Sequence, residues 1–564
     1  MNANLELVNS ETVELIIHNL NIASPDLSVN SSGKIRFDKK SPFVDIVAHI
    51  DETNIENIPA YLPKKVIPNL HAWFNRALVG GKFLSGDLLF HGHSSDYPFD
   101  NAEGRLKALI NIENTTLEYN EKWPAIDNFT AEIILNNDDL TIASHSGYIF
   151  DAKIDDLKGE IRNLSKGNHQ LNIAGSLDGH TSDATHFITQ SPLKEKKSLR
   201  ESINNVVGSF ELDLKLDILL NEGNTDVEGL VAFTDATIES NIPGLGLENV
   251  NGKVNFTSYE IWADDVQALY QGLPVSLTAP RTGPGNPYSE IYEISGIANK
   301  AFILNQLGSF FPSFNNIGKN VSAYFDGESK WSLSLKKSIS DNNVNIRNIE
   351  LSSDLNGFEI NLPYPFGKSK EETRPLTLST RLTNVSINNF NFNFDNLFFT
   401  DVIADNSKNL TIKNILIGLG QPHDKSPQTN DISIQGRLEK LNLSEWTDVI
   451  ALDNISQSQK NVTNQTKSIS GQFTIGELQI LNNNFNNVNI ELNNPDEGWD
   501  VSFDGNDIKG HTQLIKIANS QNDKLLIELE SLSLHESETG NDSGQSDISK
   551  IPELDVSIES FNYN

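Results

Sequence analysis

The stretch Phe210-Glu-Leu-Asp-Leu-Lys-Leu-Asp-Ile-Leu-Leu220 decides the fold class of this chain. Apolar side chains occupy every even position, and the odd positions from 211 to 217 all carry a charge. Successive side chains of a β-strand point to opposite faces of a sheet, whereas a helix would scatter these residues around its circumference. The pattern therefore predicts a strand with one apolar face and one face in water.

The same period of two recurs along the whole sequence. Turn-forming clusters such as residues 136–139 and 221–224 separate the alternating segments, as expected for successive antiparallel strands. The chain is therefore predicted to be mainly β. The apolar positions of three further segments are Leu106, Ala108 and Ile110, with Ile112; Trp331, Leu333 and Leu335; and Phe390, Phe392 and Phe394.

A few segments have helical spacing. The clearest lies within residues 64–81, where Leu70, Trp73 and Ala77 belong to one apolar stripe and a Gly-Gly pair follows. Residues 181–208 are interpreted as a crossover, with a polar loop to residue 197 and a short helix from Leu199 to Val207. Two more short helices are expected over 302–311 and 443–452.

A degenerate repeat is also expected. Approximate copies lie near residues 123–154, 245–277 and 480–514, and their equivalent positions are Phe129, Val250 and Val488. Weak self-similarity of this kind is typical of stacked repeats rather than independent globules. The whole of residues 1–564 is therefore predicted to form one continuous repeat-built segment.

Composition excludes several classes of function. The 564 residues include 43 Lys and Arg against 76 Asp and Glu, which gives a formal net charge of −33. Such a chain does not neutralise phosphates over a long interface, so nucleic acid is not an expected partner. It has no cysteine, so disulfides, thiolate nucleophiles and Cys-ligated metals are excluded.

Membrane and export signals are also missing from the sequence. Met1 is followed directly by polar residues, so no signal peptide is expected. No run of 18 or more apolar residues occurs, so no transmembrane helix is predicted.

A search for catalytic motifs finds no nucleophile elbow, Walker loop, Rossmann fingerprint or zinc-protease helix. No enzyme activity and no cofactor are therefore expected. His91 and His93 with Asp96 have the residue types of a metal site, but they fit solvated strand positions beside a turn better. Lys194, Lys196, Lys197 and Arg200 form a basic cluster that fits a solvated loop better than a site for an anionic partner.

Alternation alone leaves two architectures open. Apolar strand faces usually close into the core of a sandwich or barrel, but they can also line an open groove for an apolar ligand. Both arrangements need the same alternation.

Several short sequence stretches resemble a known family, the YhdP branch of the AsmA-like proteins. Its first element is Asn57-Ile-Pro-Ala-Tyr-Leu-Pro-Lys64, followed by a Trp-containing segment at 70–82, Ser85 to Gly92 and Tyr97-Pro-Phe99. Further matches follow in the same order: Leu117 to Tyr119, Trp123-Pro124, Gly272 to Val275, Asn356-Gly357, Leu362-Pro363, Phe366 to Lys368, Arg374 to Leu376, Gly436 to Leu438, Leu443 and Trp446. Together these matches span most of residues 50–510.

The resemblance implies an elongated, twisted antiparallel sheet of repeated strand groups that forms an open hydrophobic groove. Proteins of this kind are anchored in the inner membrane of Gram-negative bacteria, cross the periplasm and conduct phospholipid to the outer membrane. The present sequence lacks the family's N-terminal membrane helix, so it is interpreted as an internal segment that reaches the two membranes through parts outside it. Phospholipid is the expected partner, and envelope protein partners are not identified.

Under this interpretation, the groove-lining residues are the apolar positions of four strands. They are Leu106, Ala108 and Ile110; Phe210, Leu212, Leu214, Leu216 and Ile218; Trp331, Leu333 and Leu335; and Phe390, Phe392 and Phe394. Two alternatives stay open: a periplasmic assembly or structural factor for outer-membrane proteins that pairs its sheet edges with client strands, and a secreted β-rich hydrolase or adhesin.

Overall fold

The structure is a computed structural model of the chain. It describes residues 1–9, 12–61, 76–101, 103–165, 170–195, 206–219, 225–239, 246–283, 288, 290–310, 322–339, 345–383, 386–405, 411–423, 432–446, 449, 468–480, 483–494, 498–515, 524–534 and 553–563. The chain divides into two compact units, Met1–Arg281 and Thr282–Asn564.

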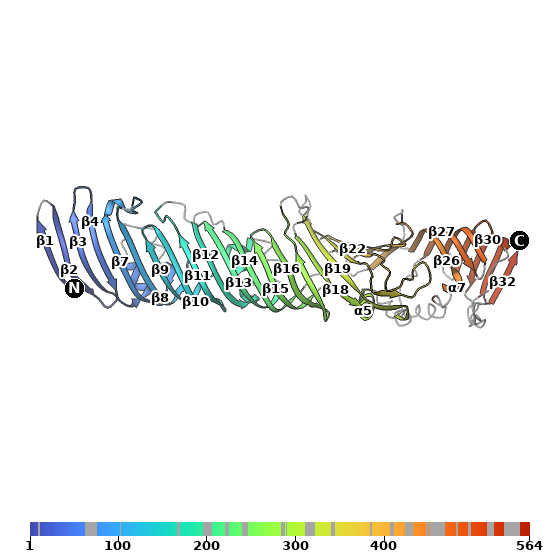
Figure 1. Cartoon of the computed structure of the whole chain (residues 1–564), viewed down its shortest axis with the longest axis horizontal. Helices are drawn as coiled ribbons and strands as arrows, with labels where there is room; N and C mark the ends of the chain where they lie inside the picture. Colours follow the sequence, from blue (N-terminus) through green and yellow to red (C-terminus); the bar gives the residue numbers. More distant parts are fainter. Residues whose placement is uncertain are drawn as a thin grey trace. The chain divides into compact units, whose positions relative to one another are not determined.

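Unit 1 is an antiparallel sheet whose strands pair in sequence order (Figure 1). The principal strands are β1 (Asn2–Asn9), β2 (Val13–Ala23), β3 (Ser28–Phe37), β4 (Pro42–Ile50), β7 (Lys82–His93), β8 (Arg105–Leu117), β9 (Ile126–Asn136), β10 (Asp139–Ile149), β11 (Ala152–Ile161), β12 (Gln170–His180), β13 (Val206–Leu219), β14 (Thr225–Ile238), β15 (Leu247–Thr257), β16 (Ile261–Tyr270) and β17 (Leu273–Ala279). Two-residue strands β5 (Thr53–Asn54) and β6 (Leu78–Val79) pair with β7 and β8.

Short helices interrupt this sheet. They are η1 (Ile55–Asn57), α1 (Ile58–Tyr61), η2 (Ser94–Asp96), α3 (Thr181–Thr189) and η3 (Pro192–Glu195). The expected loop at 181–197 is wrong in part, because α3 occupies its first half. An Asp183 carboxylate oxygen accepts a hydrogen bond from the backbone N–H of His180, the residue that caps α3, which explains why so polar a segment begins a helix.

The other expected helices of unit 1 are only partly described. Most of the Trp73 helix, residues 62–75, lies outside the described residues. Arg76 and Ala77 are helical, but Leu78, which would follow on the same helix, belongs to β6 opposite Leu117. Residues 196–205 are likewise outside the description, and Val206 and Val207 begin β13 instead of ending a helix.

Unit 2 is a mixed sheet. Its strands are β18 (Glu290–Asn299), β19 (Phe325–Ile339), β20 (Asn345–Ser353), β21 (Phe358–Ile360), β22 (Leu376–Thr383), β23 (Ser386–Phe394), β24 (Phe398–Asp405), β25 (Thr411–Leu419), β26 (Ile432–Asn442), β27 (Ile469–Ile480), β28 (Asn483–Asn494), β29 (Gly498–Asp504), β30 (Ile508–Ile515), β31 (Lys524–Leu534), β32 (Glu553–Ile558) and β33 (Phe561–Tyr563). Parallel pairs join β25 to β26, β26 to β27, and β31 to both β32 and β33. The described antiparallel pairs in the unit follow sequence order except β19 with β21 and β20 with β22.

The helices of unit 2 are α5 (Lys300–Phe310), η4 (Ser322–Tyr324) and α7 (Leu443–Trp446). The predicted helices at 302–311 and from residue 443 are therefore present, although only the first turn of the second is described. No helix in the described part of either unit is long and apolar enough to cross a membrane. The predicted fold class, a mainly β chain of repeated strand pairs with few short helices, is confirmed.

Asparagines with positive φ angles recur along the sheet. Asn128, Asn249 and Asn487 have positive φ angles of 50°, 49° and 49°, and each precedes a buried residue, Phe129, Val250 or Val488. Asparagine tolerates this left-handed conformation better than most residues. The first expected repeat copy contains Asn128 and also Asn137 (φ 53°), whereas the second and third contain Asn249 and Asn487.

Bulges of neighbouring strands also lie side by side in unit 1. Thr115, which follows Asn114 (φ 48°), is opposite Phe129, and Ala236, which follows Asp235 (φ 50°), is opposite Val250. A β-bulge bends its strand and increases the local twist. Because the bulges are in register, adjacent strands bend at the same level.

Candidate functional site

The apolar side chains of unit 1 form continuous rows that run across the strands. Residues directly opposite each other in a ladder share a face of the sheet. One row passes from β8 to β14 through the paired positions Ile110, Ile133, Ile142, Gly159, Ile173, Leu216 and Val227. The predicted residues of β8 and β13 therefore lie on one face, although about a hundred positions separate them in the sequence.

Unit 2 contains a longer row of the same kind. It runs from β18 to β32 through Ile294, Leu333, Leu351, Leu378, Phe392, Thr400, Ile417, Ile434, Gly471, Leu492, Val501, Thr512, Ile527 and Val556. The change from antiparallel to parallel pairing does not break it, because both ladders place paired residues on the same side. Every member is apolar, Gly or Thr, so the row has no charged residue.

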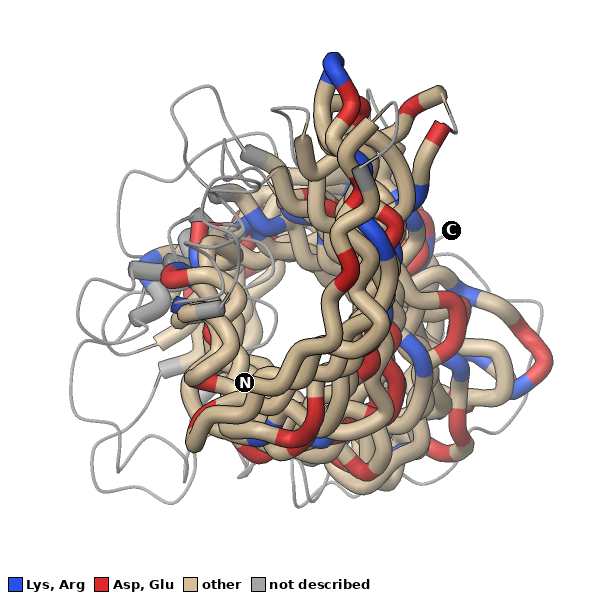
Figure 2. The backbone as a smooth tube through the Cα atoms, turned by 90° about the vertical axis from the view of Figure 1, so that its left-hand side faces the viewer, with Lys and Arg blue, Asp and Glu red and all other residues tan. Residues whose placement is uncertain are grey.

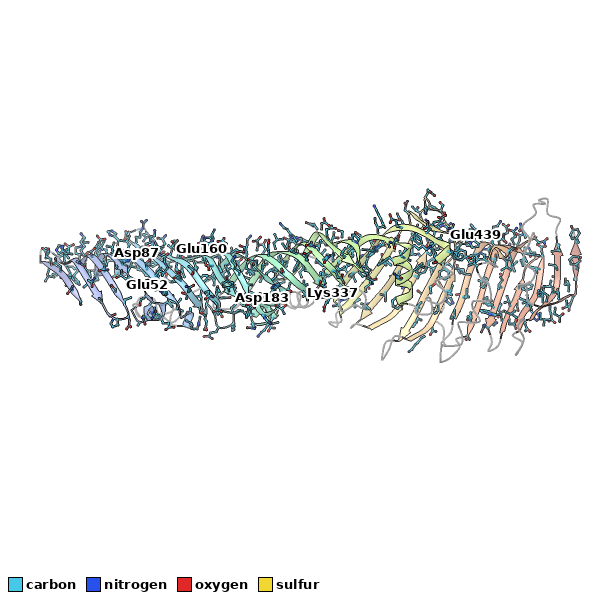
Figure 3. The ribbon with its side chains drawn as sticks, turned by 90° about the horizontal axis from the view of Figure 1, so that it is seen from below. Glu52, Asp87, Glu160, Asp183, Lys337 and Glu439 are labelled. Carbon is cyan, nitrogen blue, oxygen red and sulfur yellow. The ribbon has the colours of Figure 1, made fainter. Side chains whose placement is uncertain are left out.

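The opposite face carries charge. On β13, Glu211, Asp213, Lys215 and Asp217 are exposed and alternate with the apolar positions. Figure 2 shows Asp and Glu on the backbone together with Lys and Arg. Asp87 on β7 and Glu160 on β11 are further examples (Figure 3). The predicted division of each strand into an apolar and a charged side is thus present in β13.

The fourteen residues named from the sequence fall into two groups by burial. Leu106, Ala108, Phe210, Leu216, Ile218, Trp331 and Phe394 are buried, whereas Ile110, Leu212, Leu214, Leu333, Leu335, Phe390 and Phe392 are partly exposed. The partly exposed group is where an apolar ligand could make contact. That these residues line a groove stays a prediction.

Short segments cover parts of the apolar face in unit 1. Phe187 and Ile188 of α3, with Leu193 of η3, pack in one cluster with Leu216 and Ile218 of β13. This packing accounts for the burial of those two predicted residues. Trp123 and Tyr119 belong to the same cluster, and burial raises the pKa of the Tyr119 hydroxyl.

A loop between β20 and β22, residues 354–375, covers the face in unit 2. Phe366 contacts Phe398, with ring centroids 6.1 Å apart, and Trp446 of α7, at 5.7 Å. The indole Nε1 of Trp446 donates a hydrogen bond to the Tyr364 carbonyl at 3.2 Å. Phe392 and Phe394, two of the predicted residues, pack in the same cluster as Phe366.

Lys368 holds this covering loop together. Its buried ammonium donates hydrogen bonds to the carbonyl oxygens of Leu355 at 2.8 Å, Phe358 at 2.5 Å and Ser369 at 2.7 Å. Burial lowers the pKa of Lys368, because removing the ammonium from water disfavours its charged form. Sequence reasoning missed this role, because nothing in the local pattern distinguishes a buried lysine from a solvated one.

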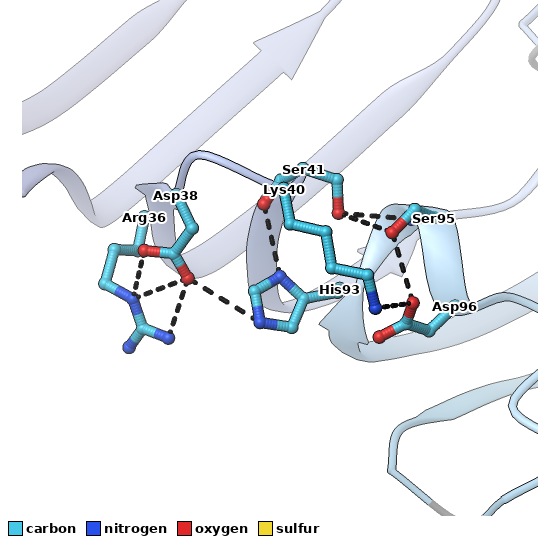
Figure 4. Close-up of polar contacts among 7 residues, drawn as sticks. All are labelled: Arg36, Asp38, Lys40, Ser41, His93, Ser95 and Asp96. Carbon is cyan, nitrogen blue, oxygen red and sulfur yellow. Dashed lines mark hydrogen bonds and ion pairs between the residues drawn. The ribbon is translucent and has the colours of Figure 1, made fainter.

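The candidate metal residues have separate partners, as Figure 4 shows for His93 and Asp96. His91 Nδ1 lies 3.0 Å from Asp45, whereas His93 Nδ1 contacts the Ser41 carbonyl at 3.1 Å. Asp96 is occupied by Lys40 at 2.6 Å, and this hydrogen bond lowers the pKa of the Asp96 carboxyl. Within the described ranges, no three His, Asp or Glu side chains are grouped to bind a metal, so the metal interpretation is not supported.

The basic cluster is described only at its first member. Lys194 is exposed in η3, and Lys196, Lys197 and Arg200 lie outside the described residues.

The family model described as YhdP protein matches residues 1–564. The chain belongs to the YhdP family. It is also similar to the intermembrane phospholipid transporter YhdP of Escherichia coli (strain K12), with 21% identity over 380 residues. That match covers 67% of this chain and 29% of the relative, so the chain spans less than a third of the relative's length. No solved structure matches the chain.

Proposed function

We propose that this chain is a segment of a bridge-like lipid-transfer protein, which conducts phospholipid between the inner and outer membranes across the periplasm. The observation that carries the proposal is the set of uninterrupted apolar rows in both units. Partly exposed members of these rows, such as Ile110, Ile142 and Ile173 in unit 1, offer an acyl chain an apolar surface on successive parts of the sheet. Membership of the YhdP family and the similarity to the intermembrane phospholipid transporter of E. coli support phospholipid as the cargo.

The energetics favour such a path. Exposing acyl tails to water costs about 0.8 kcal/mol per methylene, so a free lipid crosses an aqueous gap very slowly. Apolar side chains on one face shelter the tails, while the headgroup stays in water. Movement along the face makes and breaks no covalent bond, so this proposal requires no catalytic residue. The same comparisons favour lipid transfer over outer-membrane protein assembly.

Leu214 offers a direct test. It is partly exposed on the apolar face of β13 and lies opposite Gly175 and Gly229. Leu214→Asp should sharply reduce the phospholipid that copurifies with the gently extracted chain, measured by mass spectrometry, because a carboxylate among acyl tails is strongly disfavoured.

Lys215→Asp is the matched control. It places the same carboxylate one residue away on the charged face, where Lys215 is exposed and 3.9 Å from Glu228. This variant should retain its lipid. Equal lipid content in Leu214→Asp and the control, with unchanged far-ultraviolet circular dichroism in both, would contradict the proposed path.

A further inference from the structure

Three charged residues interrupt the apolar face in unit 2. Glu290 on β18, Lys337 on β19 and Arg347 on β20 are directly opposite one another in register. They have the same phase as Leu335 and Ile349, which form the next pair on this face.

Lys337 and Glu290 form a tight ion pair. The Lys337 Nζ lies 2.6 Å from Glu290 Oε1, and their side chains are only 12% and 23% exposed. The hydroxyl of Tyr292 donates a hydrogen bond to the other Glu290 oxygen at 3.2 Å. Lys337 is labelled in Figure 3. Removing these two charges from water costs free energy. Apolar residues at the same positions would stabilise the sheet without that cost, so stability alone does not explain the ion pair.

Arg347 contributes the charge that this pair does not neutralise. Its side chain is partly exposed, and within the described ranges its guanidinium has no ion pair or hydrogen bond. The three residues together carry one net positive charge, in a chain whose overall formal charge is −33. A guanidinium binds a phosphate through two parallel hydrogen bonds, which distinguishes it from lysine.

We propose that Arg347, supported by the Lys337–Glu290 pair, binds the phosphate of a phospholipid headgroup while the acyl tails lie on Leu333, Leu335, Ile349 and Leu351. Two residues along a strand span about 7 Å, so a phosphate at Arg347 lies close to the apolar pair Leu335 and Ile349. The site would bind phospholipids in preference to apolar molecules that have no phosphate. This inference rests on the proposed function.

The test uses a photoreactive side chain in the full-length chain. Leu351→p-benzoylphenylalanine reports lipid beside the site, and the same change at Ile173 reports lipid on the apolar face of unit 1. Each protein is delipidated and irradiated with dioleoyl phosphatidylglycerol or with dioleoylglycerol, which has the same tails and no phosphate. At Leu351, phosphatidylglycerol should crosslink about tenfold more than dioleoylglycerol, the ratio expected for one charge-assisted interaction.

Arg347→Gln should remove this preference at Leu351 and leave crosslinking at Ile173 unchanged. Arg347→Lys keeps the positive charge but cannot form two parallel hydrogen bonds to a phosphate. This variant should retain part of the preference for phosphatidylglycerol. Arg381→Gln is the matched control, because Arg381 is exposed on the neighbouring strand β22 in the opposite phase. Circular dichroism of each variant verifies that it is folded.

The outcomes separate the two proposals. If phosphatidylglycerol crosslinks at both reporters and Arg347→Gln reduces neither crosslink, the phosphate site is overturned. Lipid conduction would not be contradicted by that result. No phosphatidylglycerol crosslink at either reporter would overturn lipid conduction and this site with it. Crosslinking of phosphatidylglycerol at Leu351 that does not exceed that of dioleoylglycerol would overturn the headgroup proposal.

Discussion

At the scale of single residues, Lys368 shows how one side chain organises a covering segment. Three backbone carbonyls from the 355–369 loop converge on its ammonium, although the surroundings are largely apolar. Without the lysine, the Phe358 and Ser369 carbonyls would lose this donor, whereas the Leu355 carbonyl also accepts a hydrogen bond from the Phe358 N–H at 3.1 Å. Phe366-Gly-Lys368 is among the stretches that resemble the family, and the structure gives a physical reason for the lysine within it.

Lys368→Met should lower the free energy of unfolding of unit 2 by about 1–3 kcal/mol, because buried carbonyls lose their donor. Chemical denaturation would measure this change. Lys370→Met is the control: Lys370 is more exposed and pairs with Asp326 at 2.7 Å, so its loss should cost less than about 1 kcal/mol. Equal losses in the two variants would show that the buried contacts of Lys368 do not stabilise the loop.

At the scale of elements, strands of unit 1 such as β9 and β15 combine an alternating sequence with a bulge at a defined place. Alternation assigns the apolar face, and the bulge bends the strand where an Asn or Asp adopts a positive φ angle. Phe129 and Val250 become buried immediately after such a residue. A strand can therefore bend at its bulge while the residues before and after the bulge stay paired with the neighbouring strand.

Asn128→Val should destabilise unit 1 by about 1–2 kcal/mol, because a β-branched side chain is strongly disfavoured at positive φ. Asn128→Gly should be nearly neutral, since glycine adopts this conformation readily. Asn136→Val, on the same strand but at an exposed end without positive φ, serves as the control. Denaturation midpoints that are equal for Asn128→Val and Asn136→Val would refute the role assigned to the bulge.

At the scale of the whole molecule, the apolar rows of both units are needed in series if lipid moves along the chain. A single block anywhere on such a path stops transfer. Local packing sites that bind lipid independently would behave differently, because each would contribute separately to the total.

The double variant Leu214→Asp/Leu378→Asp distinguishes these cases. Leu378 lies opposite Leu351 and Phe392 in unit 2, so the two changes block different units. Transfer of a fluorescent phospholipid between vesicles should fall to the same low rate in either single variant and in the double variant. If each single variant retains some transfer and the double variant transfers still less, the two units contain sites that act independently.

The sequence by itself determined the mainly β class and the two faces of β13, because side-chain alternation is a local property with a period of two. It also indicated α5 and the resemblance to the YhdP family. It could not indicate that α3 and the 354–375 loop cover the apolar face, because such packing joins residues from separate elements.

Only the tertiary structure decided which strands are neighbours and in what register. Pairing brings Glu290, Lys337 and Arg347 together from three strands, and in the sequence each is one charged residue within an alternating segment. The same pairing shows that Lys337 and Arg347 share the apolar phase of their strands. Register depends on the connections between strands as well as on their composition, so the candidate phosphate site could be recognised only in the folded chain.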